Sequence, residues 1–442
     1  MQIARQTAEE HAKSLESYIS EGENLSKDLG NRGPVRFDKR GKLEEEILEA
    51  YWRTGFYVFE SVVEQSEIDS LRIEMADLLD RAPVDNGSTV DKKGRPAFGQ
   101  EFARPTFYLV EPLSDPWGGT EILNGRHPTK MNEPAPNSRV NEKVVFIMNG
   151  MCQTMPSGLR LYGHPDLLGI AASINGDDFV PYNDATFVKQ PGVGGSVSWH
   201  QDGVTHWKSP DWDQGIHGFN FQVQLYDTSA RSCLWVVPGT HKLGKIDIKR
   251  RLSEGSDSEL MPDAVPLACN AGDVTVVNRQ ALHGSFANTS NDLRISLTFG
   301  FHRRKSVIGA RGALSESSDA VYDEARVFER SKVIGYAINA RAEMHPEEST
   351  FDYLPMRGHQ AELTVNEENW NKIIKDYNLN DLSIRSYSEK QKFSISSCSS
   401  FIRVGNLFIS FILRPECGCA GDREPFLRGN FGSLYVFAWN GC

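Results

Sequence analysis

Between residues 185 and 302, hydrophobic and polar positions alternate in short runs that turn residues separate. The clearest run is 219–226, in which Asn220, Gln222 and Gln224 alternate with aromatic and aliphatic side chains. Because alternate residues of a strand face opposite sides, we expect an apolar face that packs outward and a polar face that lines a cavity. Further strands are predicted at 184–189, 197–202, 232–237, 274–277 and 293–301. About seven such strands are typical of a jelly roll.

Helical spacing flanks this β region on both sides. Residues 42–53 and a helix capped by Ser66 precede it, and helices at 318–341 and 367–377 follow it. Residues 85–140 are rich in Gly, Pro, Asn and Asp, and we expect loops there, some folding over a site. The predicted class is therefore an all-β core with flanking helices (α+β), a cupin-like double-stranded β-helix.

The pattern divides the chain into four segments. Residues 1–40 are polar and charged, and predict a frayed helix followed by a loop, an N-terminal extension. The core domain, with its N-terminal helices, is assigned to 41–305, and a helical region that packs on it to 306–385. Residues 386–442 have no assignable period and are predicted to be a poorly specified tail.

Composition excludes several classes of protein. The formal charge of −11 over 442 residues argues against nucleic-acid binding, because phosphate contacts need clustered Lys and Arg. The sequence contains no run of about 18 apolar residues, so no membrane-spanning helix is expected. Residues 1–13 do not resemble a secretory signal, and the seven cysteines do not form a disulfide framework, so we expect a cytoplasmic protein. The late cysteines lack the Cys-x2-Cys spacing that is usual for zinc.

One stretch carries metal-binding chemistry. His200 and Asp202 are two residues apart on a predicted strand, so both side chains can face one point. A second histidine would complete the 2-His-1-carboxylate face of non-haem iron sites, and His283 is the candidate. The alternatives are a surface hydrogen-bonded His–Asp pair, or a zinc-type cluster that also uses His206.

Arg294 lies on the polar face of the following strand, eleven residues after His283. A guanidinium inside a barrel is costly unless a carboxylate meets it, and Arg binds carboxylates bidentately. A dicarboxylate cosubstrate, chelating the metal at one end, would fit this position. The alternative is a structural ion pair.

Together these motifs resemble the phytanoyl-CoA dioxygenase family, from about Leu43 to about His302. The motifs are Trp199-His200-Gln201-Asp202, Pro238-Gly239-Thr240-His241-Lys242, Gly272-Asp273 and His283-Gly284-Ser285, with Asn288 and Arg294. The resemblance implies a double-stranded β-helix that uses Fe(II), 2-oxoglutarate as cosubstrate and O2, with ascorbate in support. It also implies hydroxylation of an unactivated C–H with release of succinate and CO2, since a carboxylate at position 202 leaves no place for a halide.

By this resemblance the iron ligands, which are also the catalytic residues, are His200, Asp202 and His283. The distal carboxylate of 2-oxoglutarate would be held by Arg294 and Ser285, with Lys189 beside the cosubstrate. Substrate contacts are predicted for His206, Trp207 and Gln222. Arg104, Phe107, Tyr108 and Trp117 are further candidates, with ordinary packing as their alternative.

Two other functions stay open from the sequence. One is a non-catalytic jelly roll that binds a metal or small ligand, and the other is a zinc-dependent hydrolase. A hydrolase has no need of Arg294 at its position. The expected partner is a small-molecule substrate, and neither its identity nor the oligomeric state can be predicted.

Overall fold

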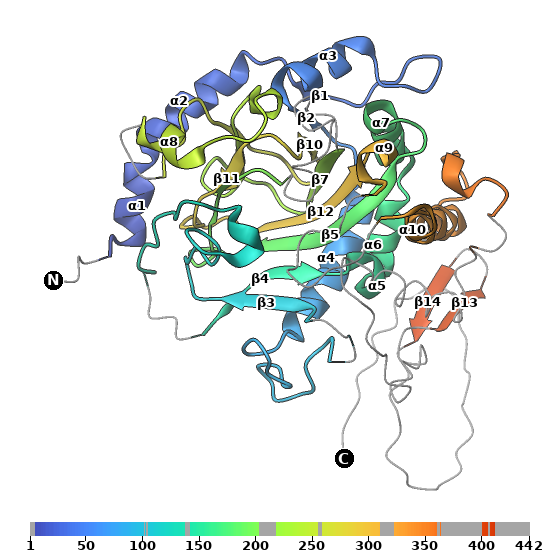
Figure 1. Ribbon diagram of the computed structural model, residues 1–442. Helices are drawn as coiled ribbons and strands as arrows, with labels where there is room; N and C mark the ends of the chain where they lie inside the picture. Colours follow the sequence, from blue (N-terminus) through green and yellow to red (C-terminus); the bar gives the residue numbers. More distant parts are fainter. Residues whose placement is uncertain are drawn as a thin grey trace, which may run out of the picture. The chain divides into compact units, whose positions relative to one another are not determined.

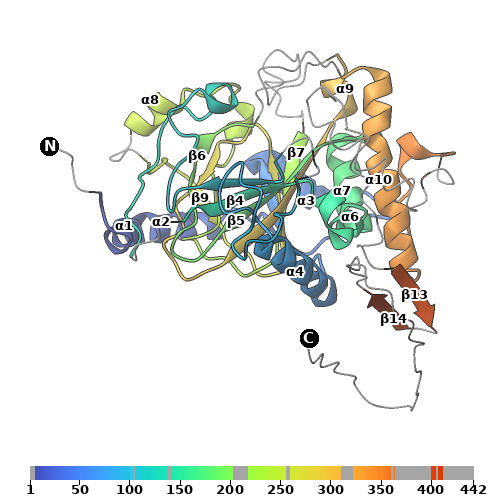
Figure 2. The same ribbon diagram turned by 90° about the horizontal axis from the view of Figure 1, so that it is seen from below.

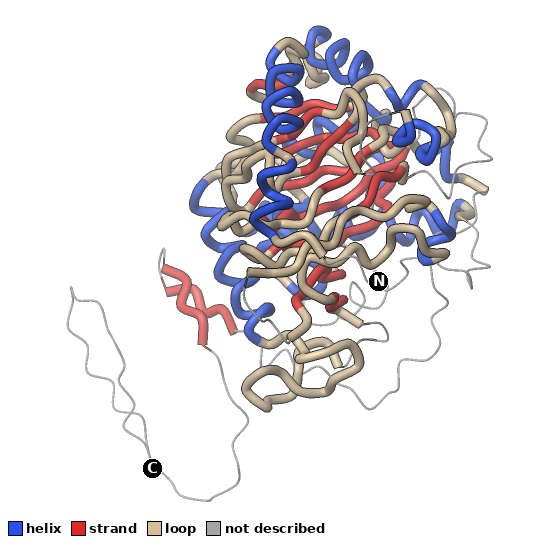
Figure 3. The backbone as a smooth tube through the Cα atoms, turned by 90° about the vertical axis from the view of Figure 1, so that its left-hand side faces the viewer, coloured by secondary structure: helices blue, strands red, loops and turns tan. Residues whose placement is uncertain are grey.

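The computed structural model describes residues 5–100, 102, 105–137, 142–202, 218–254, 259–309, 322–359, 363, 400–404 and 407–411. The chain forms two compact units, Met1–Ser388 and Glu389–Cys442. In the first unit the strands run side by side through the centre and helices lie around them (Figure 3). In the second unit, β13 (Ser400–Val404) and β14 (Leu407–Phe411) form an antiparallel pair.

The described strands of the first unit fall into two sheets. Their bounds are β1 (Arg32–Gly33), β2 (Phe56–Phe59), β3 (Phe107–Val110), β4 (Val144–Asn149), β5 (Val180–Lys189), β6 (Val197–His200), β7 (Gly218–Gln224), β8 (Leu234–Val236), β9 (Val265–Leu267), β10 (Val274–Asn278), β11 (His283–Ser285) and β12 (Arg294–His302). The larger sheet has the order β1-β2-β10-β7-β12-β5-β4-β3, and the smaller sheet has the order β6-β11-β8-β9. The larger sheet is antiparallel except for the β1–β2 pair, and the smaller sheet is antiparallel throughout. Two such sheets of interleaved strands make a double-stranded β-helix, so the predicted fold class is confirmed.

Helices surround these sheets. Their bounds are α1 (Ala8–Ser14), α2 (Glu16–Lys27), α3 (Glu45–Thr54), α4 (Gln65–Asp80), α5 (Met151–Thr154), α6 (Pro156–Tyr162), α7 (Pro165–Asn175), α8 (Ile248–Ser253), α9 (Arg304–Val307) and α10 (Glu324–Met344), with 3-10 turns η1 (Ile122–Gly125), η4 (Thr240–Lys242) and η5 (Leu354–Met356). Helices α4, α6, α7 and α10 gather on one side of the larger sheet (Figure 2).

The outer face of the larger sheet packs against these helices. On β7, Phe219, Phe221 and Val223 are fully buried in the main hydrophobic cluster, together with Leu71 of α4 and Leu168 of α7. The alternate residues of β7 face inward, and two of them line a cavity. The two faces predicted for this strand are therefore confirmed, and the apolar face fixes its register.

The N-terminal segment is more ordered than predicted. Thr7 forms a capping box with Glu10 at the start of α1, and α2 follows it. Leu15 is buried, and the ring of Tyr18 stacks on Trp235 of the smaller sheet with centroids 4.8 Å apart. Figure 1 shows α1 and α2 along one side of the first unit. The prediction of a frayed helix was wrong, because the apolar side chains of this segment are buried against the smaller sheet.

Other local predictions need correction. The residue that caps α4 is Glu64 rather than Ser66, which lies inside the helix. The stretch 85–140 is mostly loop as predicted but contains β3, which pairs with β4. The tail contains the β13–β14 pair, which was not predicted. The helix predicted at 367–377 lies outside the described residues, and the predicted domain boundaries stay predictions.

Candidate metal centre and its cavity

Two antiparallel strands of the smaller sheet bring the predicted histidines together. In the pairing of β6 with β11, His200 lies directly opposite His283. Asp202 follows two residues after His200, just beyond the end of β6, and its backbone N–H donates to the carbonyl of Arg279. One ligand atom from each of the three side chains lies within 4.8 Å of the others, and all three residues are buried. The expected His–Asp–His cluster is therefore present in the fold.

Each histidine presents the same nitrogen to the centre of the cluster. His200 Nδ1 lies 2.8 Å from the carbonyl of Ser198, and His283 Nδ1 lies 2.8 Å from the carbonyl of Ala281. A carbonyl only accepts, so Nδ1 carries the proton in both rings and Nε2 keeps its lone pair. Burial lowers the pKa of both imidazoles, that of His283 to about 3. Both rings are therefore neutral, which is the state that binds metals.

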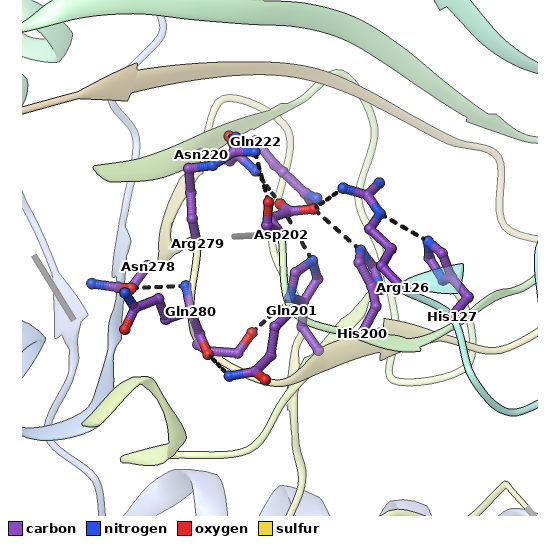
Figure 4. A network of polar contacts seen from close by, with 12 residues as sticks. Arg126, His127, His200, Gln201, Asp202, Asn220, Gln222, Asn278, Arg279 and Gln280 are labelled. Carbon is purple, nitrogen blue, oxygen red and sulfur yellow. Dashed lines mark hydrogen bonds and ion pairs between the residues drawn. The ribbon is translucent and has the colours of Figure 1, made fainter. Parts of the chain in front are cut away.

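Asp202 is held as a carboxylate by its neighbours. Arg126 Nη1 donates to its Oδ1 at 3.0 Å and Asn220 Nδ2 donates to its Oδ2 at 2.5 Å (Figure 4). Burial opposes the charge, but Arg126 and Arg279 hold the pKa of Asp202 well below its usual range. His200 Nε2 is 3.4 Å from Oδ1, and His283 Nε2 is 3.8 Å from Oδ2. Two neutral imidazoles and one carboxylate on a single face fit a divalent transition metal with positions left open.

Arg279 supports the same carboxylate indirectly. Its Nη1 donates to Asn220 Oδ1 at 2.8 Å, and its Nη2 donates to the backbone carbonyl of Asp202 at 3.2 Å (Figure 4). Its guanidinium lies 4.3 Å from the ring centroid of Tyr182. These contacts fix the amide of Asn220 with its Nδ2 toward Asp202, because Oδ1 is occupied by the guanidinium.

A second arginine and a third histidine join the cluster from a distant loop. Arg126 follows η1, and its Nε donates to His127 Nε2 at 3.2 Å. The ring of His127 lies 4.1 Å from that of His200, and its Nδ1 contacts the same Ser198 carbonyl. Burial, His200 and Arg126 lower the pKa of His127 well below its usual value, so this ring is also neutral.

The cluster lies at a cavity of about 810 Å³. His200, Asp202 and His283 all line it, together with Arg294 and Ser285. Its apolar lining includes Phe107, Tyr108, Trp117, Leu123, Ile147 and Phe187. A cavity of this size, with aromatic and aliphatic side chains beside many polar and charged ones, suits a small organic molecule that carries polar groups. Phe107, Tyr108 and Trp117 therefore line the cavity, and their contact with a substrate stays a prediction.

Arg294 occupies the inner face of β12 with neutral partners only. Its three nitrogens donate to Ser296 Oγ at 2.9 Å, the Ser232 carbonyl at 3.1 Å and Gln222 Oε1 at 3.0 Å. Among the described residues it has no salt bridge to a carboxylate, although it is 2 % exposed. Burial lowers its pKa to about 10, so it remains cationic at neutral pH. Two of its five N–H groups have no partner among the described residues, and a buried cation without a carboxylate partner favours an anionic ligand.

The remaining predicted residues lie in different surroundings. Ser285 and Gln222 line the cavity. Lys189 is opposite Arg294 on β5, but its ammonium donates to the Phe286 carbonyl at 2.5 Å and is not part of the cavity lining. His206, Trp207 and Arg104 lie outside the described residues. Of the other histidines near the motif, His241 contacts the carbonyl of Trp52 at 3.1 Å, away from the cavity.

Sequence reasoning missed Arg126, His127 and Arg279. Arg279 lies four residues before His283, and its position could have been recognised from the sequence. A charged residue next to a buried strand needs a polar partner, which would have suggested a place for Arg279 near the metal site. Arg126 and His127 lie 76 and 71 residues from the groups that they contact, in a stretch without periodicity. No spacing rule connects them to the site.

Comparisons with known proteins agree with this geometry. The family model described as phytanoyl-CoA dioxygenase (PhyH) matches residues 51–296, more than half of the chain. "Phytanoyl-CoA dioxygenase 1" from Oryza sativa subsp. japonica is 32% identical over 117 residues, which cover 25% of this chain and 40% of that relative. "Phytanoyl-CoA dioxygenase" from Arabidopsis thaliana is 24% identical over 269 residues, 58% of this chain and 87% of that relative.

Solved structures show weaker likeness. AviO1 from Streptomyces viridochromogenes Tue57 matches with 20% identity and a TM-score of 0.40, over 61% of this chain and 96% of that one. At this score the likeness carries no argument about substrate or reaction. Within the described part of the chain, no helix has the length and apolar character needed to cross a membrane.

Proposed function

Because the chain belongs to the phytanoyl-CoA dioxygenase family, we propose that it is an Fe(II)- and 2-oxoglutarate-dependent dioxygenase. In this proposal it hydroxylates an unactivated C–H of a small organic substrate and releases succinate and CO2. The observation that carries the proposal is the buried His200–Asp202–His283 cluster at the cavity, with Arg294 in the same lining. Arg294 has no carboxylate partner in the described part of the chain. A metal site alone needs only the cluster, whereas a dicarboxylate cosubstrate explains the arginine as well.

The three ligands would hold Fe(II) through His200 Nε2, His283 Nε2 and one oxygen of Asp202. Fe(II) with 2-oxoglutarate supplies the oxygen activation and C–H oxidation when both are bound. The protein contributes orientation, because each ligand is fixed by a second hydrogen bond. Asp202 fills the ligand position that a halide would otherwise need, which favours hydroxylation as the outcome.

The other end of 2-oxoglutarate would meet Arg294, with Ser285 beside it. Gln222 Oε1 accepts a hydrogen bond from Arg294 Nη2. Gln222 would therefore orient the guanidinium of Arg294 in addition to any contact that it makes with the substrate. Substrate would lie against the aromatic side chains of the lining, which exclude water from the reacting centre. His206 and Trp207 stay predicted substrate contacts.

Succinate release tests this proposal. Purified protein with Fe(II), 2-oxoglutarate, ascorbate and a panel of small organic substrates should form succinate only when O2 is present. His200→Ala should abolish it, whereas His241→Gln, a change to a buried histidine away from the cavity, should not. Succinate formation that persists in His200→Ala would contradict the proposal. Turnover of another substrate with zinc and without O2 would indicate the hydrolase instead.

A further inference from the structure

We propose that Arg126 is a positioning residue that fixes the orientation of the Asp202 carboxylate in the metal site, at a cost in metal affinity. The inference rests on the proposed function, since it takes Asp202 to be a metal ligand. It concerns a residue of the loop that lines the substrate cavity, 76 positions before the carboxylate that it contacts.

The contacts show how the carboxylate is held. Arg126 binds Oδ1 at 3.0 Å and Asn220 binds Oδ2 at 2.5 Å, so each oxygen has a separate donor on a separate element (Figure 4). Rotation about the Cβ–Cγ bond of Asp202 would break both hydrogen bonds. One donor is itself held by Arg279, and the other by its contact with His127. The carboxylate plane is therefore set before a metal arrives.

The charge of Arg126 makes its placement unusual for a residue that serves metal affinity. Its side chain is 10% exposed, so its positive charge is poorly screened. A guanidinium on Oδ1 withdraws electron density from a ligand oxygen, and it repels a divalent cation bound nearby. A group that only strengthened metal binding would be neutral or negative here. What Arg126 adds is therefore orientation.

The same residue connects the cavity lining to two ligands. Ile122 and Leu123 of the preceding turn line the cavity, and Arg126 itself lines it. Through His127, whose ring lies 4.1 Å from that of His200, the loop also contacts the first histidine ligand. Arg126 therefore links the cavity lining to two metal ligands, and a substitution at Arg126 should change the geometry of those ligands.

Cobalt(II) alone provides the test, because its visible absorption reports coordination number and ligand geometry. Wild type, Arg126→Met and Arg126→Lys are titrated anaerobically and followed by absorption and calorimetry. Arg126→Met should bind one Co(II) on the order of threefold more tightly than wild type, since a repelling charge is gone. Its absorption spectrum should differ from that of wild type, since Asp202 is free to rotate. Arg126→Lys keeps the charge and one donor, and should restore the wild-type affinity and most of the wild-type spectrum.

Arg341→Met is the matched control. Arg341 is a buried arginine that pairs with Glu67 at 2.9 Å and with Glu348 at 2.6 Å, and it does not line the cavity. Its loss should lower stability and leave the Co(II) spectrum unchanged. If Arg126→Met does not fold by circular dichroism, Arg126→Gln, which also removes the charge, replaces it.

Failure of the inference is distinguishable from failure of the proposed function. If wild type does not bind one Co(II), or if His200→Ala binds it equally well, the metal site itself is wrong. If wild type binds Co(II) through His200 but the neutral Arg126 variant has the wild-type spectrum, the positioning role is overturned. Weaker Co(II) binding in that variant than in wild type overturns the cost in metal affinity.

Discussion

Replacing Arg294 by Lys isolates the bidentate part of cosubstrate recognition. In the structure three N–H groups of Arg294 are used by Ser296, Ser232 and Gln222, all neutral acceptors. The two that remain can meet both oxygens of one carboxylate. A lysine keeps a positive charge at this position but presents a single nitrogen, so one charged hydrogen bond to the ligand is lost.

The loss can be estimated from that single bond. A hydrogen bond to a charged group contributes roughly 1.5–3 kcal/mol, so the affinity for 2-oxoglutarate should fall about 10- to 150-fold. Burial of the new ammonium adds to the loss. Burial, together with the charge of Arg294, already lowers the pKa of Lys189 on the facing strand well below its usual range. The change should therefore lie toward the upper part of this interval.

The assay compares two 2-oxo acids by calorimetry on the Co(II)-loaded protein without oxygen. 2-Oxoglutarate carries a distal carboxylate and 2-oxobutyrate does not. Arg294→Lys should weaken 2-oxoglutarate binding and leave 2-oxobutyrate binding nearly unchanged. Arg341→Lys, a change to a buried arginine away from the cavity, is the control and should affect neither.

Two results would contradict this role of Arg294. A change of less than threefold for 2-oxoglutarate would show that Arg294 does not meet the distal carboxylate. Equal weakening of both acids would show that the substitution disturbs the metal site, and that Arg294 has a structural role.

Three further predictions concern stability. The pKa of His164, an N-cap whose Nδ1 accepts from the Asp166 N–H, is lowered by burial from 6.5 to about 3. Protonation therefore favours the unfolded state, and the free energy of unfolding falls as the pH drops below 6.5. His164→Asn should reduce that fall by about 1.4 kcal/mol per pH unit between pH 6 and 4, measured by urea unfolding. An unchanged dependence of the free energy of unfolding on pH would contradict this prediction. Phe301→Ala should cost about 3–5 kcal/mol by the same method, because Phe301 is fully buried in the main cluster, and a loss below 1 kcal/mol would be inconsistent with that burial. Gly55→Ala should cost about 1–3 kcal/mol in thermal or urea unfolding, because Gly55 has φ +87° and a Cβ would lie 2.4 Å from His241 Nδ1; a neutral effect would show that neither constraint holds.

Much of the fold and of the candidate site could be predicted from the sequence, because both depend on the alternation of residues along single strands. Alternation in 219–226 gave both faces of β7, since one face had to be buried. The spacing of His200 and Asp202 placed both side chains at one point, and the alternation in 293–301 placed Arg294 on the polar face, which lines the cavity. These inferences need only the periodicity of a strand.

The rest depends on contacts that no local rule describes. Arg126 reaches Asp202 across 76 residues, from a turn without periodic pattern. The packing of Tyr18 on Trp235 likewise joins segments more than 200 residues apart, so polar composition alone predicted a frayed end. Such contacts are set by the closure of the whole barrel, which brings loops and termini together only in three dimensions.

Anaerobic addition of Fe(II) and 2-oxoglutarate to the purified protein shows whether the buried cluster binds a metal and the cosubstrate together. If His200, Asp202 and His283 bind the metal and leave positions open for a chelating cosubstrate, a visible metal-to-ligand charge-transfer band should form in wild type. The band should be absent in His200→Ala and present in His241→Gln. Absence of the band in wild type, or an equal band in His200→Ala, would contradict the account.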